Sequence, residues 1–376
     1  MQVTRRNMVF LAIAVAGVLT LWATAAREAV APKGQAGGSA AAPAGELHAP
    51  EGLAEGRLPP NAIDSEAIPD MVLAADADAD APLPYYRIGP DSYMLYGNIA
   101  EVDADNRGWN GNAGFVVTEQ GVVVIDALGT PKLGQRFIAT IRSVTDRPIT
   151  HLIVTHNHPD HAYGAVAFRR AGDVTVIAHE GTLEYLNSTS LESSVAFRRS
   201  FIEADMEGFE AVRPDHLIGG EPLSLQRTLS LGSKRFAIYN AGKHHSYGDL
   251  VVHQTDDQIL WISDLAFNHR TTFMGDGSSK DAVAAQSWLL ENFPDVRLMV
   301  PGHGSAQTPP FPMVAETRAY MERLRADMAE AVEHGMGLQE AVESSDFSEW
   351  HGTRLYEENH SKNANFVYRE MELELF

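Results

Sequence analysis

Four side chains that can bind a metal ion lie within six residues, in the string Thr155–His161. His156, His158, Asp160 and His161 follow an apolar run, His151–Thr155, that has the composition of a buried strand. Alternate residues of a strand share a face, so His156 and His158 can point the same way, and the chain must then turn at Pro159. Two ligand groups from one loop suit two metal ions roughly 3.5–4 Å apart.

Three further candidate ligands follow later strand-like runs. They are His245, Asp264 and His303. Taken singly, each is more typical of a surface or structural residue than of a ligand. Taken together, they supply the three ligands that a two-metal site still lacks. His244 competes with its neighbour His245 for the same role.

The composition limits which ligands and partners are available. Cysteine is absent, which excludes disulfides, thiolate metal sites and Cys nucleophiles, whereas 15 histidines leave imidazole sites open. The 29 Lys and Arg against 50 Asp and Glu give a net charge of −21. Such acidity argues against nucleic acid or an anionic membrane surface as a partner. We therefore expect a small-molecule substrate.

The first 84 residues differ from the rest of the chain. Arg5 and Arg6 precede the uncharged run Met8–Ala26, a pattern typical of an export signal, loosely of the twin-arginine type, or of an uncleaved membrane anchor over residues 1–31. Either reading predicts a periplasmic or exported protein, or one anchored to the outer face of the inner membrane. Residues 32–84, rich in Ala, Pro, Gly and acidic side chains, predict a flexible linker.

Strand-like and helix-like runs alternate from Tyr85 onward, and strands outnumber helices. This pattern predicts an α/β sandwich over residues 85–310, with helices covering two sheets. Amphipathic runs then predict a helical extension over residues 311–376. The predicted strands are 114–118, 121–126, 151–155, 174–178, 235–239, 250–254, 259–263 and 297–300, and the predicted helices are 133–144, 282–292, 313–333, 337–343 and 363–375.

With these motifs in this order, the sequence resembles the metallo-β-lactamase-fold hydrolase superfamily over about Tyr85–Thr308. The resemblance implies a four-layer αββα sandwich with its site at one edge of the two sheets. It implies a first zinc ion held by His156, His158 and His245, and a second held by Asp160, His161 and His303, with Asp264 bridging the two. The family pattern also favours His245 over His244. Further strings are similar to periplasmic zinc metallohydrolases associated with quinoprotein and sulfur-oxidation systems.

The resemblance implies a hydrolase that uses two Zn²⁺ ions, although the nitrogen and carboxylate donors also suit iron or manganese. A metal-bridging hydroxide, oriented by Asp160 as the catalytic residue, would attack an ester, thioester or lactone. Two alternatives stay open. One is a β-lactamase, although β-lactamases replace the Asp264 position or use other ligands, and the other is an iron-dependent dioxygenase of the same fold.

Several residues beside the motifs have roles that the sequence leaves open. Asp126 ends a buried strand and either supports the metal loop or is a plain turn residue. For His179, a structural role is favoured over a place in the pocket. Four loop residues are candidate substrate contacts, although such residues are more often solvated: Lys243, Tyr247, His269 and Arg270.

Overall fold

A computed structural model describes residues 73–375 of the chain, all within one compact unit, Gly45–Phe376. The predicted signal or anchor, and residues 32–72 of the predicted linker, lie outside the described residues. No helix within residues 73–375 combines the length and the apolar character needed to cross a bilayer.

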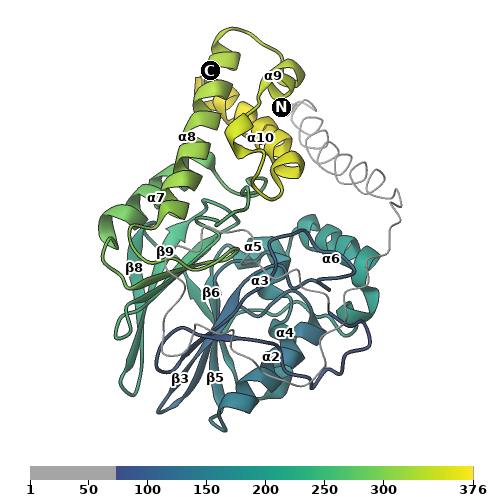
Figure 1. The fold of residues 1–376 in the computed structure, drawn as a ribbon, viewed down its shortest axis with the longest axis vertical. Coiled ribbons are helices and arrows are strands. Elements are labelled where there is room, and N and C mark those ends of the chain that lie inside the picture. Colours follow the sequence, from purple (N-terminus) through teal and green to yellow (C-terminus); the bar gives the residue numbers. More distant parts are fainter. Residues whose placement is uncertain (1–72, 376) are drawn as a thin grey trace, which may run out of the picture. The chain divides into compact units, whose positions relative to one another are not determined.

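The N-terminal half of the described chain forms a seven-stranded sheet whose strands lie in chain order (Figure 1). Pairing is antiparallel from β1 to β4 and parallel from β4 to β7. The predicted hairpin at Glu119-Gln120 joins β3 to β4. The strands are β1 (Tyr86–Arg87), β2 (Ser92–Leu95), β3 (Ala113–Thr118), β4 (Gly121–Ile125), β5 (Ile149–Val154), β6 (Thr175–His179) and β7 (His216–Ile218).

The second sheet has five strands in the order β12-β11-β10-β9-β8. Its pairing is antiparallel from β8 to β11, and β12 joins β11 in parallel. The parallel pair needs a crossover, which the helix α7 (Ser279–Asn292) supplies. The strands are β8 (Ser224–Leu231), β9 (Lys234–Gly242), β10 (Asp249–Gln254), β11 (Ile259–Ser263) and β12 (Leu298–Pro301).

Apolar residues on both faces of the central strands produce four layers. Along β4, Val122 and Val124 pack under the helices on the outer face, while Val123 and Ile125 pack against the second sheet. The same alternation runs along β11, where Trp261 faces the first sheet. Because side chains alternate across a strand, such uninterrupted apolar runs require a covering layer on each side.

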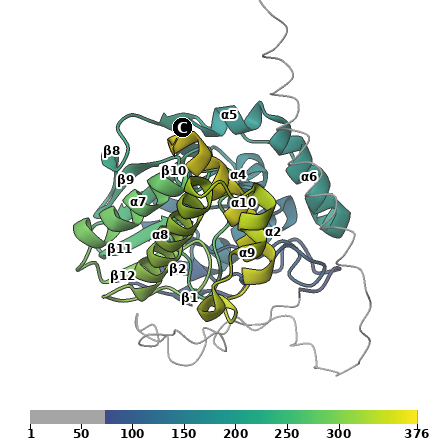
Figure 2. The same ribbon diagram turned by 90° about the horizontal axis from the view of Figure 1, so that it is seen from above.

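Helices provide the two outer layers (Figures 1 and 2). On the first sheet lie α2 (Pro131–Val144) and α4 (Ala165–Ala171), and on the second lie α7 and the start of α8 (Pro312–Glu333). Helix α2 begins where the Thr130 hydroxyl accepts from the backbone N–H of Leu133, with Pro131 at its first position. The predicted αββα sandwich is confirmed.

Further helical segments lie between β5 and β7 along the chain. They are α3 (Pro159–Ala162), α5 (Thr182–Leu186), α6 (Thr189–Ile202) and the 3₁₀ turn η2 (Glu203–Met206). The sequence did not predict α6, because its apolar residues follow no clear helical stripe and the helix buries only Arg198 and Ile202.

The predicted C-terminal extension is helical. It comprises most of α8, then α9 (Leu338–Ser344), the 3₁₀ turn η3 (Ser348–Trp350) and α10 (Tyr356–Leu375), which begins seven residues before the predicted start at Asn363. These helices share an apolar cluster that includes Tyr320, Phe347 and Val367. Figure 2 looks down on α8, α9 and α10 grouped together.

One predicted boundary needs correction, because residues 73–84 pack on the sandwich instead of continuing the linker. The Leu83 side chain is fully buried in the cluster beneath α2, and its N–H donates to the Thr140 hydroxyl at 2.7 Å. Arg136 donates to the carbonyl of Ala81. The composition of residues 73–84 did not predict this packing, because a single buried leucine is enough to hold a short polar segment against the sandwich.

Candidate metal centre

The metal motif lies on a loop and a short helix that follow β5. The strand ends at Val154, so His156 and His158 stand on a loop and not on one face of a strand, although their ligand atoms still lie in one group. Helix α3 begins at Pro159, whose fixed φ suits a first helical position. This helix carries Asp160 and His161. The strand-to-helix turn therefore separates the motif into the two ligand pairs that the sequence predicts.

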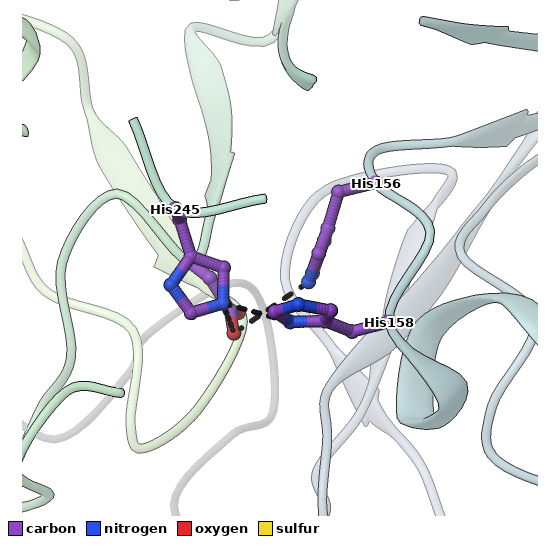
Figure 3. Close-up of side chains that lie close together, drawn as sticks. His156, His158 and His245 are labelled. Atoms are coloured by element: carbon purple, nitrogen blue, oxygen red, sulfur yellow. Dashed lines mark hydrogen bonds and ion pairs between the residues drawn. The ribbon is translucent and has the colours of Figure 1, made fainter. Parts of the chain in front are cut away.

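Three imidazoles and one carboxylate form the first group. His156, His158, His245 and Asp264 each offer one ligand atom, and these atoms all lie within 4.8 Å of one another. Nδ1 of His158 lies 2.9 Å from Nε2 of His245. Figure 3 shows the rings of His156 and His158 facing the ring of His245, which comes from another segment. Such convergence of nitrogen and carboxylate donors is typical of a site for a divalent cation.

The second group contains Asp160, His161 and His303, whose ligand atoms also lie within 4.8 Å of one another. Nε2 of His303 lies 3.3 Å from Oδ2 of Asp160, and Nε2 of His161 lies 3.9 Å from the same oxygen. All three residues are buried. His303 arrives from the loop after β12, which runs beside β11 in the other sheet.

Asp264 joins the two groups. Its Oδ2 lies 3.1 Å from Nε2 of His245 in the first group, and its Oδ1 lies 3.4 Å from Nε2 of His161 in the second. Oδ2 is also 3.3 Å from Nε2 of His303. The structure thus brings together all seven residues that the sequence proposed as ligands, with Asp264 in contact with both groups.

The outer ring nitrogens of four imidazoles have polar partners. Nδ1 of His161 lies 2.9 Å from Asp126, Nδ1 of His303 lies 2.6 Å from the Asn110 carbonyl, and Nε2 of His158 lies 3.1 Å from Asp276. Nδ1 of His156 lies 3.1 Å from the Ser263 hydroxyl. These contacts hold the rings in place, and a carboxylate at the outer nitrogen, as in His158 and His161, favours a proton there and leaves the other nitrogen available for a metal ion.

Asp126 is therefore a supporting residue of the metal loop. Besides His161, its carboxylate accepts from the N–H and the hydroxyl of Thr155. Burial raises the pKa of Asp126, against the lowering effect of His161. Asp126 also has a positive φ of 60°, an uncommon conformation outside glycine that turns the chain directly after β4.

His245 and His244 point in different directions, which separates the two candidates. Nδ1 of His244 lies 3.0 Å from Oδ2 of Asp249, and His244 belongs to neither ligand group. The same carboxylate accepts from the backbone N–H groups of His245 and Ser246. Asp249 thus shapes the loop that presents His245.

Burial and mutual charge give the ligand residues unusual pKa values. Burial lowers the pKa of His156 well below its ordinary value and also lowers that of His245. For His161, burial acts downward, but Asp264, Asp126 and Asp160 raise its pKa to about 10. For Asp264, burial acts upward, but the histidines around it lower its pKa. The carboxylates around His161 therefore stabilise positive charge at this ring, and a bound metal ion would supply that charge in place of the proton.

The residues present fit a metal ion. Nε2 of His156, Nε2 of His161 and Oδ1 of Asp264 are buried and have no hydrogen-bond partner within residues 73–375, and all three face the interior of the cluster. Leaving a buried polar atom unsatisfied costs roughly 1–3 kcal/mol, and more when the group is charged. A cation coordinated by these atoms would remove that cost.

The other residues that the sequence analysis proposed near the site differ in their distance from the ligands. His179 accepts from the N–H of Gly181 and contacts Asn240 Oδ1 at 3.0 Å, a structural arrangement. Lys243 pairs with Glu184 at the surface, and the Tyr247 hydroxyl contacts Ser190. Of these candidates, Arg270 comes nearest the ligands.

The Arg270 guanidinium is buried, with Nη1 2.8 Å from Nδ1 of His303, and lies over the ring of Phe267. His269 precedes it, with a positive φ of 61° and a buried Nε2 that has no hydrogen-bond partner among the described residues. Nothing places His269 against a ligand.

Sequence reasoning missed several residues that touch the ligands, among them Asn110, Arg198, Ser263 and Asp276. The Asn110 amide donates to Oδ2 of Asp160 at 2.9 Å, and Nη2 of Arg198 lies 3.8 Å from Oδ1. The Gly-rich run around Asn110 was a usable signal, since it precedes a strand that reaches the site. Arg198 gave no such signal, because it lies within helix α6, which the sequence did not predict.

Comparison with known proteins agrees with this geometry. A family model described as the Metallo-beta-lactamase superfamily matches residues 106–303, more than half of the chain, and all seven candidate ligands lie inside the match. The chain is 26% identical over 193 residues to the metallo-beta-lactamase type 2 of Bacillus sp. (strain 170). That alignment covers 50% of this chain and 64% of the relative.

Solved structures share the fold. The stereoselective inverting sec-alkylsulfatase of Pseudomonas sp. superposes with a TM-score of 0.61 at 18% identity, covering 76% of this chain and 50% of that protein. A metallo-beta-lactamase of Pontibacter korlensis gives 0.50 at 18% identity, covering 64% of this chain and 99% of that one. At identities this low, the superpositions establish a common fold and nothing further. The family match shows that the chain belongs to the metallo-beta-lactamase superfamily.

Proposed function

We propose that the protein is a binuclear zinc hydrolase that acts on an ester, thioester or lactone. The observation that carries this proposal is the position of Asp264, which contacts His245 of the first group and His161 of the second. Two ligand groups that share a carboxylate suit a metal pair. Since the alignments span 64% of the Bacillus relative and half of the sulfatase, activity is inferred from the site itself.

Each group would hold one ion, and Asp264 would serve both. His156, His158 and His245 complete the first position, and Asp160, His161 and His303 complete the second. When bound, zinc ions would polarise the substrate carbonyl and make water a strong nucleophile at neutral pH. The donors would accept iron or manganese as well.

Asp160 is assigned the catalytic role. Its Oδ2 lies among the second group, where Asn110 holds it, so the carboxylate is positioned to accept a hydrogen bond from the attacking water. Burial would raise the pKa of Asp160, but the charges of His161, His303 and Arg198 lower it, which keeps the group ionised. An ionised carboxylate can orient water without a nucleophilic Ser or Cys.

The N-terminal composition supports an exported or periplasmic location, with membrane contact only through an uncleaved N-terminal anchor. The net charge of −21 supports a small-molecule substrate over nucleic acid. The similarity to the Bacillus metallo-beta-lactamase favours β-lactam hydrolysis as a second candidate. A third is an iron-dependent dioxygenase of the same fold.

Metal analysis and a substrate panel test the proposal on the full chain. We expect about two zinc ions per chain, and turnover of a thioester or a lactone. Asp264→Ala should lose metal and lower kcat/KM about 100-fold or more, since it removes a contact to both groups. Asp281→Ala, an exposed residue of α7, is the matched control.

Other results distinguish the alternatives. Turnover of a cephalosporin alone would favour the β-lactamase, and one tightly held iron with oxygen uptake would favour the dioxygenase. Hydrolysis that survives Asp264→Ala at the level of Asp281→Ala contradicts a two-metal mechanism.

A further inference from the structure

Helix α6 buries a single cation beside the second ligand group. Arg198 is 4% exposed, although the next residue, Arg199, is exposed to solvent. Burying a guanidinium is costly unless charged or polar groups compensate it. The contacts of Arg198 therefore indicate what this burial achieves.

The guanidinium contacts three acceptors near the site. Nη2 lies 3.8 Å from Oδ1 of Asp160, an ion pair, and 3.5 Å from Oδ1 of Asn110. Nη1 donates to the carbonyl of Gly129 at 3.3 Å. The ion pair involves Oδ1 of Asp160, while Oδ2 faces His303 and Asn110.

The backbone around Arg198 is shaped to admit the guanidinium. A Cβ at Gly108 or at Gly129 would lie 2.7 Å from Nη1, closer than any normal contact. Gly108 also has a positive φ of 85°, which disfavours other residues. A Cβ at Gly129 would also lie 2.2 Å from the carbonyl oxygen of Gly108, so the two glycines form a cradle that is open to the guanidinium and closed to a further side chain.

Asn110 links this cradle to a second ligand. Its amide donates to Oδ2 of Asp160, and its backbone carbonyl lies 2.6 Å from Nδ1 of His303. Arg198 and Asn110 together therefore touch two of the three residues of the second group. Neither has a polar contact with His156, His158 or His245 within the described chain. The arrangement is specific to the second group.

We propose that Arg198 is a positioning residue that fixes the Asp160 carboxylate for the second metal ion, acting with Asn110. This inference rests on the proposed two-metal function. Without the guanidinium, Oδ1 loses its partner and the carboxylate can rotate away from His303. Removing such supporting contacts typically weakens metal binding or activity about 10–100-fold. The first ion should be unaffected.

Metal titration of the metal-depleted full chain tests this, with Zn²⁺ followed by calorimetry and Co²⁺ by its visible absorption. In Arg198→Met we expect the first equivalent to bind as in wild type and the second about 10–100-fold more weakly. Arg198→Lys, which keeps the charge but loses the planar fork, should fall between them. Arg199→Met should match wild type. Asn110→Ala keeps the buried cation, and should show the same selective loss even if Arg198→Met does not fold.

The outcomes separate this inference from the proposed function. Two unchanged equivalents in Arg198→Met and Asn110→Ala would overturn the positioning role and leave the two-metal hydrolase standing. Equal weakening of both equivalents would also overturn it, because a general structural role predicts that result. A wild-type chain that binds only one equivalent would overturn both.

Discussion

The carboxylate of Asp276 lies 3.1 Å from Nε2 of His158. The two residues are far apart in the chain, and Asp276, which lies between β11 and α7, is not one of the motif residues. The contact holds the His158 ring so that its Nδ1 faces His245 at 2.9 Å. Asp276 thus supports the first ligand group, as Asp126 supports the second.

We predict that Asp276→Ala weakens the first metal equivalent about 10–100-fold, because the His158 ring loses the partner of its outer nitrogen. Calorimetric titration of the metal-depleted chain measures this. Asp281→Ala, a few residues later on α7, is the control. Unchanged affinity for both equivalents would show that the contact does not orient His158.

Asp126→Ala should lower the free energy of unfolding. The N–H of Thr155 would lose its buried acceptor, and an unsatisfied buried donor costs about 1–3 kcal/mol. Asp126→Asn should cost less, since its carbonyl can still accept from Thr155. Urea denaturation of the metal-depleted variants measures both, with exposed Asp173→Ala as the control. A loss for Asp126→Ala no larger than for Asp173→Ala would count against this account.

Helix α10 of the C-terminal extension forms hydrogen bonds with the backbone of the loop that carries Asp276. Asn363 of α10 donates to the carbonyl of Thr272 at 2.8 Å and accepts from the N–H of Met274 at 3.0 Å. Asn359 donates to the carbonyl of Thr271. A helix near the end of the chain is thereby tied to the edge of the metal centre.

Asn363→Ala should therefore destabilise the protein by about 1–3 kcal/mol, because both backbone groups lose a buried partner. Hydrogen exchange should speed up at residues 271–276 more than in β4 or β5, since local opening becomes easier. Exposed Lys362→Ala should change neither. An equal increase in exchange rate across the whole sandwich would mean that the hydrogen bonds of Asn363 do not stabilise this loop locally.

Glu119 predicts a pH dependence at the opposite end of the sheets. It lies in the β3–β4 turn, and its carboxylate accepts from the N–H and hydroxyl of Ser233 in the β8–β9 turn. These hydrogen bonds lower its pKa from 4.5 to about 2. Because the folded pKa is depressed, the stabilisation is complete above pH 4.5 and is lost as the pH falls through about 2.

The Tm of wild type should accordingly exceed that of Glu119→Gln by more at pH 6 than at pH 2. Scanning calorimetry of both metal-depleted proteins between these values measures the gap. A gap that stays constant with pH would show that ionisation of Glu119 does not stabilise the contact between the turns.

The local part of the site could be predicted from the sequence. The string His156–His161 places two pairs of donors around a proline, and this spacing alone indicates two ligand groups. Strands such as β4 and β11 were predictable because apolar runs buried on both faces have few alternative structures. Residues 73–84 and helix α6 were mispredicted or missed, since their packing depends on one or two side chains.

The sequence by itself determined the donor chemistry, the absence of thiolate ligands and the sandwich that carries the motif. Tertiary structure decided which distant groups support each ligand. Asp276 meets His158, Arg198 meets Asp160 and α10 braces the loop between β11 and α7. The physical reason is that these contacts join segments far apart in the chain, and no local periodicity or propensity encodes which pairs the folded layers bring together.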